Sequence, residues 1–259
     1  MIAATYGNQS QSAKLLQLDS STGLQVGEVT LRTVTNQAIT EFRSMTRIGD
    51  QIICSYVSGT TEAGLGYINP STGVVSNIPN APYSPLGLGN RDGRILLGDF
   101  DYIQEFDLTT NTITLQTILQ LQGGVYYAFR DVTWDGFRYV LPYDGASVGP
   151  GGRNALTFWD PGTGEFQGNP RIETAGTHPN GVDFDPTSGR FWVASYLEGT
   201  STSRLSAYPQ NAISQVPEVS FTINNALLAD VLYIPVPAPA AVSLFGVAAL
   251  TGARRRRIA

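Results

Sequence analysis

The sequence has 259 residues, including 28 glycines and 15 prolines, with 10% aromatic and only 14% charged residues. Few charges and many turn formers favour short strands joined by turns over amphipathic helices. The net charge is -5, and the body is more acidic still because four of the basic residues are the arginines of residues 254–257. An acidic body argues against nucleic acid as a partner, since phosphates require a basic surface.

The first residues, MIAATYGNQSQSAKLL, contain no basic segment followed by an apolar one, so no secretory signal is visible there. Cys54 is the single cysteine, which excludes an intramolecular disulfide and a cysteine-based metal site. It lies in the run IICSYV, whose pattern is typical of a half-buried strand. We therefore expect Cys54 to be a small core residue and not a nucleophile.

A hairpin motif recurs along the chain at intervals of about 38 to 53 residues. Each copy has an apolar run, an Asp or Asn that can bond the backbone two residues on, and a closing residue suited to a positive φ. The copies are AKLLQLDSSTGLQVGEV, GLGYINPSTGVVSNI, QEFDLTTNTITLQTI, ALTFWDPGTGEFQGN and the degenerate RLSAYPQNAISQVPEV. The predicted closing residues are Gly23, Gly73, Asn111 and Gly164.

A second pattern precedes each hairpin: a turn with Asp or Gly, then a strand that ends near an aromatic residue. RIGDQIICSY, NRDGRILLGDF, TWDGFRYVLPY and DPTSGRFWVASY carry it, whereas MIAATYG matches only its later half. The missing earlier half is found in NNALLADVLYIPV, near the other end of the chain. The innermost strands are predicted around Ile48, Leu88, Val132, Val182 and Val231.

This arrangement predicts an all-β fold, a β-propeller of five blades. Each blade would have four antiparallel strands, and the N- and C-terminal strands would join in one blade to close the ring. A β-sandwich with irregular hairpins is the alternative, but it does not explain the repeated order of elements. We expect residues 1–234 to form the propeller and residues 235–259 to form a separate tail that contains an apolar helix.

The stretch HPNGVDFDPTSGRFWVASY, from His178 to Tyr196, resembles NHL-type repeats and the blades of the gluconolactonase family. The resemblance implies that Asn180 is a ligand of a central divalent cation. The competing interpretation is ordinary turn chemistry for Asn followed by Gly. His178 is the only histidine, so a multi-histidine metal site is excluded.

Other candidates have a structural and a functional interpretation. Pairs of aspartates that alternate along a strand point to one face and could share a cation, but turn positions explain them equally well. The aromatic residues could stack on sugar rings or pack between blades. The aspartate pairs are Asp99/Asp101, Asp131/Asp135 and Asp183/Asp185. The aromatic residues are Tyr126, Tyr127, Phe129, Trp134, Phe137, Tyr139, Tyr143, Phe158 and Trp159.

The chain ends in a proline-interrupted linker, an uncharged apolar run over residues 240–253 and a block of four arginines, Arg254, Arg255, Arg256 and Arg257. With the linker, the uncharged stretch reaches the low end of a membrane-spanning length. Arginines on one side of such a segment anchor that end in the cytoplasm. The sequence therefore predicts an inner-membrane anchor, with a disordered basic tail as the alternative.

These three parts resemble a PEP-CTERM sorting domain, whose Val-Pro-x-Pro motif corresponds here to Val236, Pro237, Ala238 and Pro239. Ala238 replaces the usual Glu. The resemblance implies a secreted cell-surface protein of a Gram-negative, exopolysaccharide-producing bacterium, anchored transiently and processed by an exosortase-type enzyme. Such a protein needs a signal peptide, so we expect Met1 to be an internal start.

No motif of a hydrolase elbow, a phosphate loop or a zinc protease is present. The leading hypothesis is a binding or scaffold module that acts on the cell surface or in the extracellular matrix and recognises carbohydrate or surface proteins. The alternative is a lactonase- or lyase-like enzyme that uses a divalent cation. No catalytic residue is assigned.

Overall fold

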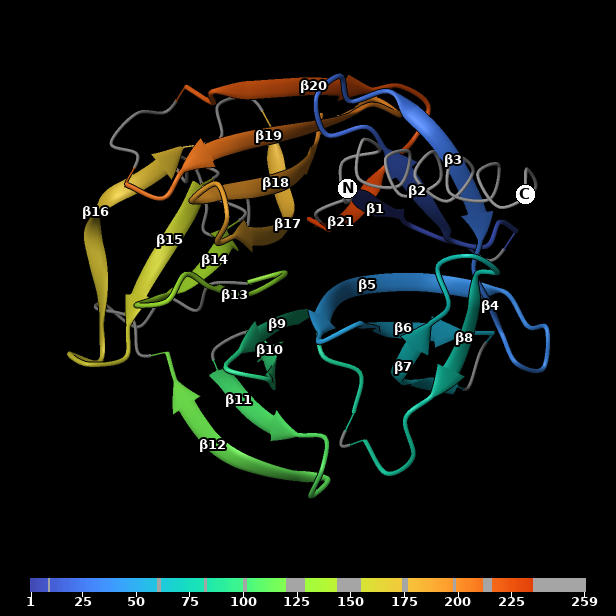
Figure 1. Cartoon of the computed structure of the whole chain (residues 1–259), viewed down its shortest axis with the longest axis horizontal. Helices are drawn as coiled ribbons and strands as arrows, with labels where there is room; N and C mark the ends of the chain where they lie inside the picture. The colour runs from blue at the N-terminus through green and yellow to red at the C-terminus, as the bar shows by residue number, and fades with distance from the viewer. Residues whose placement is uncertain are drawn as a thin grey trace, which may run out of the picture.

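In this computed structural model the described residues are 1–8, 10–59, 62–81, 83–99, 102–119, 129–143, 155–173, 177–197, 199–211 and 216–234. They form five antiparallel sheets arranged around a central axis, which is a five-blade β-propeller (Figure 1). No helix occurs in the described part of the chain. The predicted all-β propeller of five blades is confirmed.

Each blade is one sheet, and its strands run outward from the axis. The first blade consists of β21 (Leu228–Leu232), β1 (Ile2–Thr5), β2 (Lys14–Leu18) and β3 (Gln25–Thr30). The second consists of β5 (Ile39–Ile48), β6 (Gln51–Ser58), β7 (Glu62–Ile68), β8 (Val74–Asn77) and the short β4 (Arg32–Thr33).

The other three blades have four strands each. The third blade consists of β9 (Gly87–Arg91), β10 (Arg94–Asp99), β11 (Tyr102–Asp107) and β12 (Thr112–Ile118). The fourth consists of β13 (Thr133–Trp134), β14 (Tyr139–Tyr143), β15 (Ala155–Asp160) and β16 (Glu165–Glu173). The fifth consists of β17 (His178–Asp185), β18 (Arg190–Tyr196), β19 (Ser203–Pro209) and β20 (Val219–Ile223).

The first and second blades differ from a simple repeat of four consecutive strands. In the first blade β21 pairs with β1 in antiparallel register, with Ala3 opposite Val231, so the inner strand comes from the other end of the described chain. The second blade has a fifth strand that the repeat pattern did not predict. The chain that leaves β3 crosses the outer edge of β8, and β4 pairs there in parallel, with the Arg32 N–H donating to the Gly73 carbonyl at 3.0 Å.

The hairpin turns close as the sequence predicted. Gly23, Gly73 and Gly164 have φ values of 70°, 73° and 72°, and Asn111 has a φ of 57°. In the first hairpin the Asp19 carboxylate accepts the backbone N–H groups of two following residues at 2.9 and 2.8 Å. Four blades therefore share an Asx turn, and in each of them the turn closes with a Gly or Asn, which tolerates a left-handed backbone.

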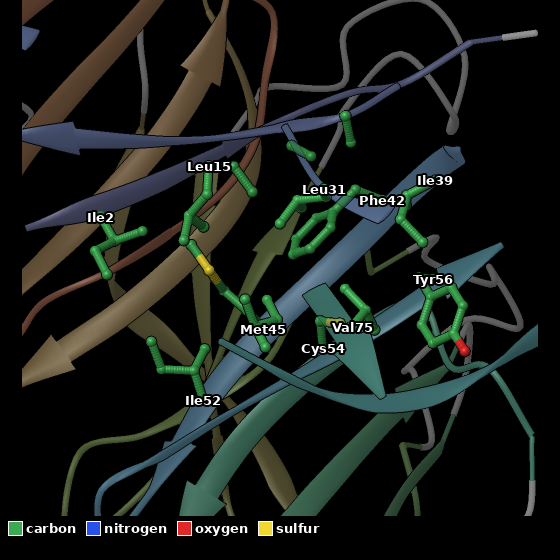
Figure 2. Close-up of a cluster of buried hydrophobic side chains, with 14 of the residues drawn as sticks. Ile2, Leu15, Leu31, Ile39, Phe42, Met45, Ile52, Cys54, Tyr56 and Val75 are labelled. Carbon is green, nitrogen blue, oxygen red and sulfur yellow. The ribbon is translucent and has the colours of Figure 1, made fainter. Parts of the chain in front are cut away.

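The core consists of five apolar clusters, each between two neighbouring blades. The cluster between the first and second blades packs Leu15 of β2 against Phe42 of β5 and Cys54 of β6 (Figure 2). Cys54 is fully buried, as predicted, and burial raises the pKa of its thiol. Since each sheet buries both faces against its neighbours, no single blade has a core of its own.

The tail predictions fall on residues 235–259, which lie outside the described residues. This concerns the apolar helix, the sorting motif Val236–Pro239 and the arginines of residues 254–257. Asp101, Tyr126 and Tyr127 also lie outside them. Within the described ranges, the structure has no helix whose length and apolar character would let it cross a membrane.

Candidate functional site

The five inner strands meet at the axis through one position each. These positions are Asp230 of β21, Ser44 of β5, Gly87 of β9, Gly181 of β17 and Asp131, which immediately precedes Val132 and β13. A Cβ at Gly87 would lie 2.4 Å from the Cα of Asp131, and one at Gly181 would lie 2.1 Å from Oδ1 of Asp230. The two glycines therefore leave the space that the two aspartates fill. We call these five residues the axial ring.

The two aspartates of the axial ring join the blades by hydrogen bonds. Asp131 accepts the backbone N–H of Leu88 at 3.1 Å and of Val182 at 2.7 Å, which come from the third and fifth blades. Asp230 accepts the N–H of Met45 at 2.6 Å and of Val231 at 2.6 Å, which come from the second and first blades.

Ser44 lies between the two carboxyl groups. Its hydroxyl is 2.7 Å from Asp131 Oδ1 and 3.2 Å from Asp230 Oδ2. Both aspartates are at most 1% exposed. Inner-strand backbone groups of four different blades thus share two adjacent carboxyl groups.

Two buried carboxyl groups in contact do not both ionise readily. Burial raises the pKa of Asp131, although hydrogen bonds from Ser44 and Val182 oppose this. Burial and the nearby Asp131 charge raise the pKa of Asp230 well above its usual range. The two carboxyl groups therefore keep protons to a higher pH than exposed aspartates do.

On one side of the axial ring, the carboxyl ends of the five inner strands surround a cavity of about 540 Å³. All five blades contribute to its wall. We call it the axial funnel; its lining includes Thr46 of β5, Asn90 of β9, Thr133 and Trp134 of β13, Asp183 of β17 and Tyr233, which follows β21. A cavity that combines hydroxyl, amide, carboxyl and aromatic groups is the usual form of a small-molecule site.

Asp183 is the most distinctive titratable group of the funnel. It follows Val182 by one residue and is partly exposed, while its Oδ2 accepts the Tyr233 N–H at 2.8 Å. Desolvation raises the pKa of its carboxyl to about 7, opposed by the hydrogen bond from Tyr233. Near neutral pH such a carboxyl exists in both forms, so it can accept or donate a hydrogen bond to a ligand hydroxyl.

The Trp134 ring of the funnel wall contacts an ionic network centred on the buried Glu105. The Arg91 guanidinium lies 4.4 Å from the ring centroid and 2.7 Å from Glu105 Oε1. Glu105 is 4% exposed and also pairs with Arg94 at 3.2 Å, while it accepts the Tyr139 hydroxyl at 3.3 Å. This network joins the third and fourth blades and fixes the position of the indole.

A second group of polar and aromatic side chains lies at the amino ends of the inner strands, on the other side of the axial ring. The His178 imidazole stacks on Tyr196, with 4.7 Å between centroids and an interplanar angle of 13°. Burial raises the pKa of Tyr6 to about 12, although an Arg130 hydrogen bond opposes this. His178 is thus engaged with an aromatic neighbour.

Asn180, the predicted metal ligand, is 1% exposed. Its Nδ2 donates to the Leu228 carbonyl at 3.1 Å, which ties the fifth blade to the first. Its Oδ1 is buried with no hydrogen-bond partner among the described residues. An orphaned buried oxygen suits a cation, but the described ranges contain no group of three His, Cys, Asp or Glu residues able to hold a metal ion.

Two of the predicted aspartate pairs lie within the described residues, and in both the second aspartate has the turn role that was the alternative to a shared cation. Asp131 belongs to the axial ring, whereas Asp135 accepts the N–H groups of Phe137 and Arg138 at 2.9 and 2.7 Å in a turn. Asp183 faces the funnel, whereas Asp185 bonds the turn N–H of Thr187 at 2.9 Å. Alternation predicted a shared face, but in both cases the second residue lies at or beyond the strand end.

Sequence reasoning did not identify Ser44 or Asp230. A signal existed, because the segments RDVTW and ADVLY place Asp131 and Asp230 at the same point before an inner-strand valine. Among the predicted aromatic residues, Phe129, Tyr139 and Trp159 are buried in the cluster between the third and fourth blades, whereas Phe137 is 74% exposed.

Comparison with known proteins gives likeness of fold alone. No protein-family model and no curated protein matches the sequence. Among solved structures, a periplasmic gluconolactonase of Pseudomonas aeruginosa is similar at 13% identity and a TM-score of 0.49, over 91% of this chain and 85% of the other. The hydrazine synthase of Kuenenia stuttgartiensis is similar at 14% identity and a TM-score of 0.40, over 77% of this chain. The matched region spans 57% of that synthase chain, little more than half its length.

Proposed function

We propose that this protein is a binding module that holds a small polar molecule, neutral or cationic, in the axial funnel. The observation that carries the proposal is the composition of the funnel wall, to which all five blades contribute hydrogen-bonding side chains around Asp183. One arginine and four aspartates line the funnel, so an anionic ligand is disfavoured.

The test is a thermal-unfolding screen of the full chain against a panel of neutral, cationic and anionic small metabolites, sugars included. A ligand of the native state raises the melting temperature with concentration. We expect a neutral or cationic compound to do so, and Asp183→Asn to reduce the shift while Asp50→Asn, in an exposed turn, does not. A panel that yields only anionic ligands, or a shift that Asp183→Asn leaves unchanged, would refute the funnel as the site.

We further propose that the propeller is exported to the cell surface and sorted by an exosortase-type enzyme through residues 235–259. The order of Val236–Pro239, the apolar residues 240–253 and the arginines of residues 254–257 supports this. The test is expression behind a signal peptide in a host with and without such an enzyme. Release of the body should require the enzyme and be lost in Pro237→Ala; release that is independent of both would contradict the proposal.

A divalent-metal lactonase or lyase is the second candidate, and the unpartnered Asn180 Oδ1 is the observation that favours it. Calcium or zinc alone should then raise the melting temperature of the full chain, and Asn180→Ala should remove that rise. No shift with either ion would remove the metal-dependent candidate. A shift of equal size in Asn180→Ala would show that the ion binds elsewhere.

A further inference from the structure

A second hollow adjoins the axial funnel. This hollow, of about 890 Å³, lies between the fourth and fifth blades, and we call it the side cleft. Trp134 and Gly136 line both spaces. The funnel and the side cleft therefore meet at the turn of residues 135–138, and we call the two together the groove.

An exposed aromatic side chain lies on this turn. Phe137 is 74% exposed and lines the side cleft. Two residues separate it from Trp134, whose ring lies 4.4 Å from the Arg91 guanidinium. The groove thus has one aromatic ring in its funnel half and one in its cleft half.

The turn that carries Phe137 is rigid. Asp135, 2% exposed, accepts the N–H of Phe137 at 2.9 Å and pairs with the Arg138 guanidinium at 2.7 and 3.0 Å. From the fifth blade, Gln210 donates to the Asp135 carbonyl at 2.7 Å. A ring on a turn fixed from two blades loses little conformational entropy when a ligand covers it.

Around Phe137 the side cleft presents amide and carboxyl groups in a fixed array. Arg138 donates to Gln167 Oε1 at 3.2 Å, and Gln167 Nε2 approaches Asp160 Oδ2 at 3.4 Å. Gln210 and Asn211 complete this wall. Planar polar groups beside an aromatic face match a sugar ring, which has hydroxyls at its edge and C–H groups on its face.

Charge narrows the class of ligand further. Four aspartates and Arg47 line the funnel, and one of these aspartates, Asp135, neutralises Arg138 of the side cleft, which leaves three aspartates against Arg47. An anionic chain would meet like charges along the groove. A neutral chain could form hydrogen bonds with the same groups without electrostatic repulsion.

From these observations we infer that the groove binds a neutral oligosaccharide, with one sugar unit in the axial funnel and the following units over Phe137 in the side cleft. The inference rests on the proposed function for the funnel unit. The side cleft is an additional subsite, since it lies outside the axis and involves the outer parts of two blades.

The test uses isothermal titration of the full chain with gluco-, xylo- and manno-oligosaccharides of one to six units, and with oligogalacturonides as the anionic series. In at least one neutral series we expect the Kd to fall at least ten-fold between the monosaccharide and the longer chains. Phe137→Ala should remove this gain and leave the monosaccharide unchanged. Leu24→Ala, an equally exposed apolar residue at 67%, is the matched control and should keep the gain.

The outcomes separate the two proposals. If a monosaccharide binds in an Asp183-dependent way and longer chains bind no better, the side-cleft subsite is refuted while the funnel site stands. If the gain persists in Phe137→Ala, or if only the anionic series or a peptide library binds through Phe137, the oligosaccharide assignment is refuted. If no sugar of any length binds, the inference fails whether or not another small molecule occupies the funnel.

Discussion

Removal of the Asp131 carboxylate should destabilise the propeller more than any single surface change. In Asp131→Ala the buried Val182 N–H loses its acceptor, whereas the Leu88 N–H keeps Ser44 Oγ at 2.8 Å and the Ser44 hydroxyl keeps Asp230 at 3.2 Å. A buried donor left without a partner costs about 1–3 kcal/mol, and we expect a loss of that size from Val182. The lost hydrogen bond lies at the axis, where the blades meet.

The assay is urea unfolding at pH 7, followed by tryptophan fluorescence, for the native chain, Asp131→Ala and Asp50→Asn. The last variant removes an exposed carboxylate, 3.7 Å from Arg47, and should change the free energy of unfolding by less than about 0.5 kcal/mol. If Asp131→Ala unfolds at the same urea concentration as the native chain, the reasoning about the axial ring is wrong.

Asp131 and Asp230 should also make the free energy of unfolding depend on pH. Since the folded pKa values of Asp131 and Asp230 are raised above the unfolded values, the folded state holds more protons in the window that begins near the unfolded pKa of about 4. This part of the stability is fully present below that pH and is lost as pH rises through the folded pKa values. Each extra proton contributes a slope of about 1.4 kcal/mol per pH unit. Asp230→Asn, which resembles the protonated acid, should flatten the slope between pH 5 and 8; an unchanged slope would contradict the raised pKa values.

Three further predictions concern other parts of the fold. Glu105→Ala should cost on the order of 3 kcal/mol in urea unfolding, because the charge of Arg91 loses its buried partner, and an unchanged midpoint would contradict the network. Gly23→Ala should destabilise the protein more than Gly49→Ala, although both have a positive φ, because a Cβ at Gly23 would lie 2.2 Å from the Phe221 ring and one at Gly49 meets nothing within 4 Å. Equal losses would show that φ strain alone decides. Cys54 should not react with a thiol reagent until the chain unfolds, since it is buried and the pKa of its thiol is raised; rapid reaction in the native state would contradict its place in the core.

The sequence was sufficient for the propeller because the hairpin signal is local. An Asx residue, a Gly or Asn at a positive φ and a flanking apolar run lie within about ten residues, so four of the five blades can be recognised independently of one another. The same locality identified Gly23 and Asn111 as turn residues. The short β4 was not predicted, because it depends on where the chain crosses β8 and not on its own two residues.

Local sequence patterns did not predict the axial ring, because its contacts join residues that are far apart along the chain. Ser44 bonds Asp131 across 87 positions and Asp230 across 186. Strand alternation paired Asp131 with Asp135, but β13 ends at Trp134, and the Asp135 carboxylate accepts the turn N–H groups of Phe137 and Arg138 instead. Aligning the Asp-Val steps of the inner strands would have found Asp230, yet its burial and its contact with Asp131 follow only from the closed arrangement of blades.

The most direct test of the account is titration of the full chain with the ligand that the thermal screen selects, in the native form, Asp183→Asn and Asp50→Asn. We predict binding at one site, weakened at least ten-fold by Asp183→Asn and unchanged by Asp50→Asn. Equal affinity in the native chain and Asp183→Asn would contradict the claim that the axial funnel is the functional site.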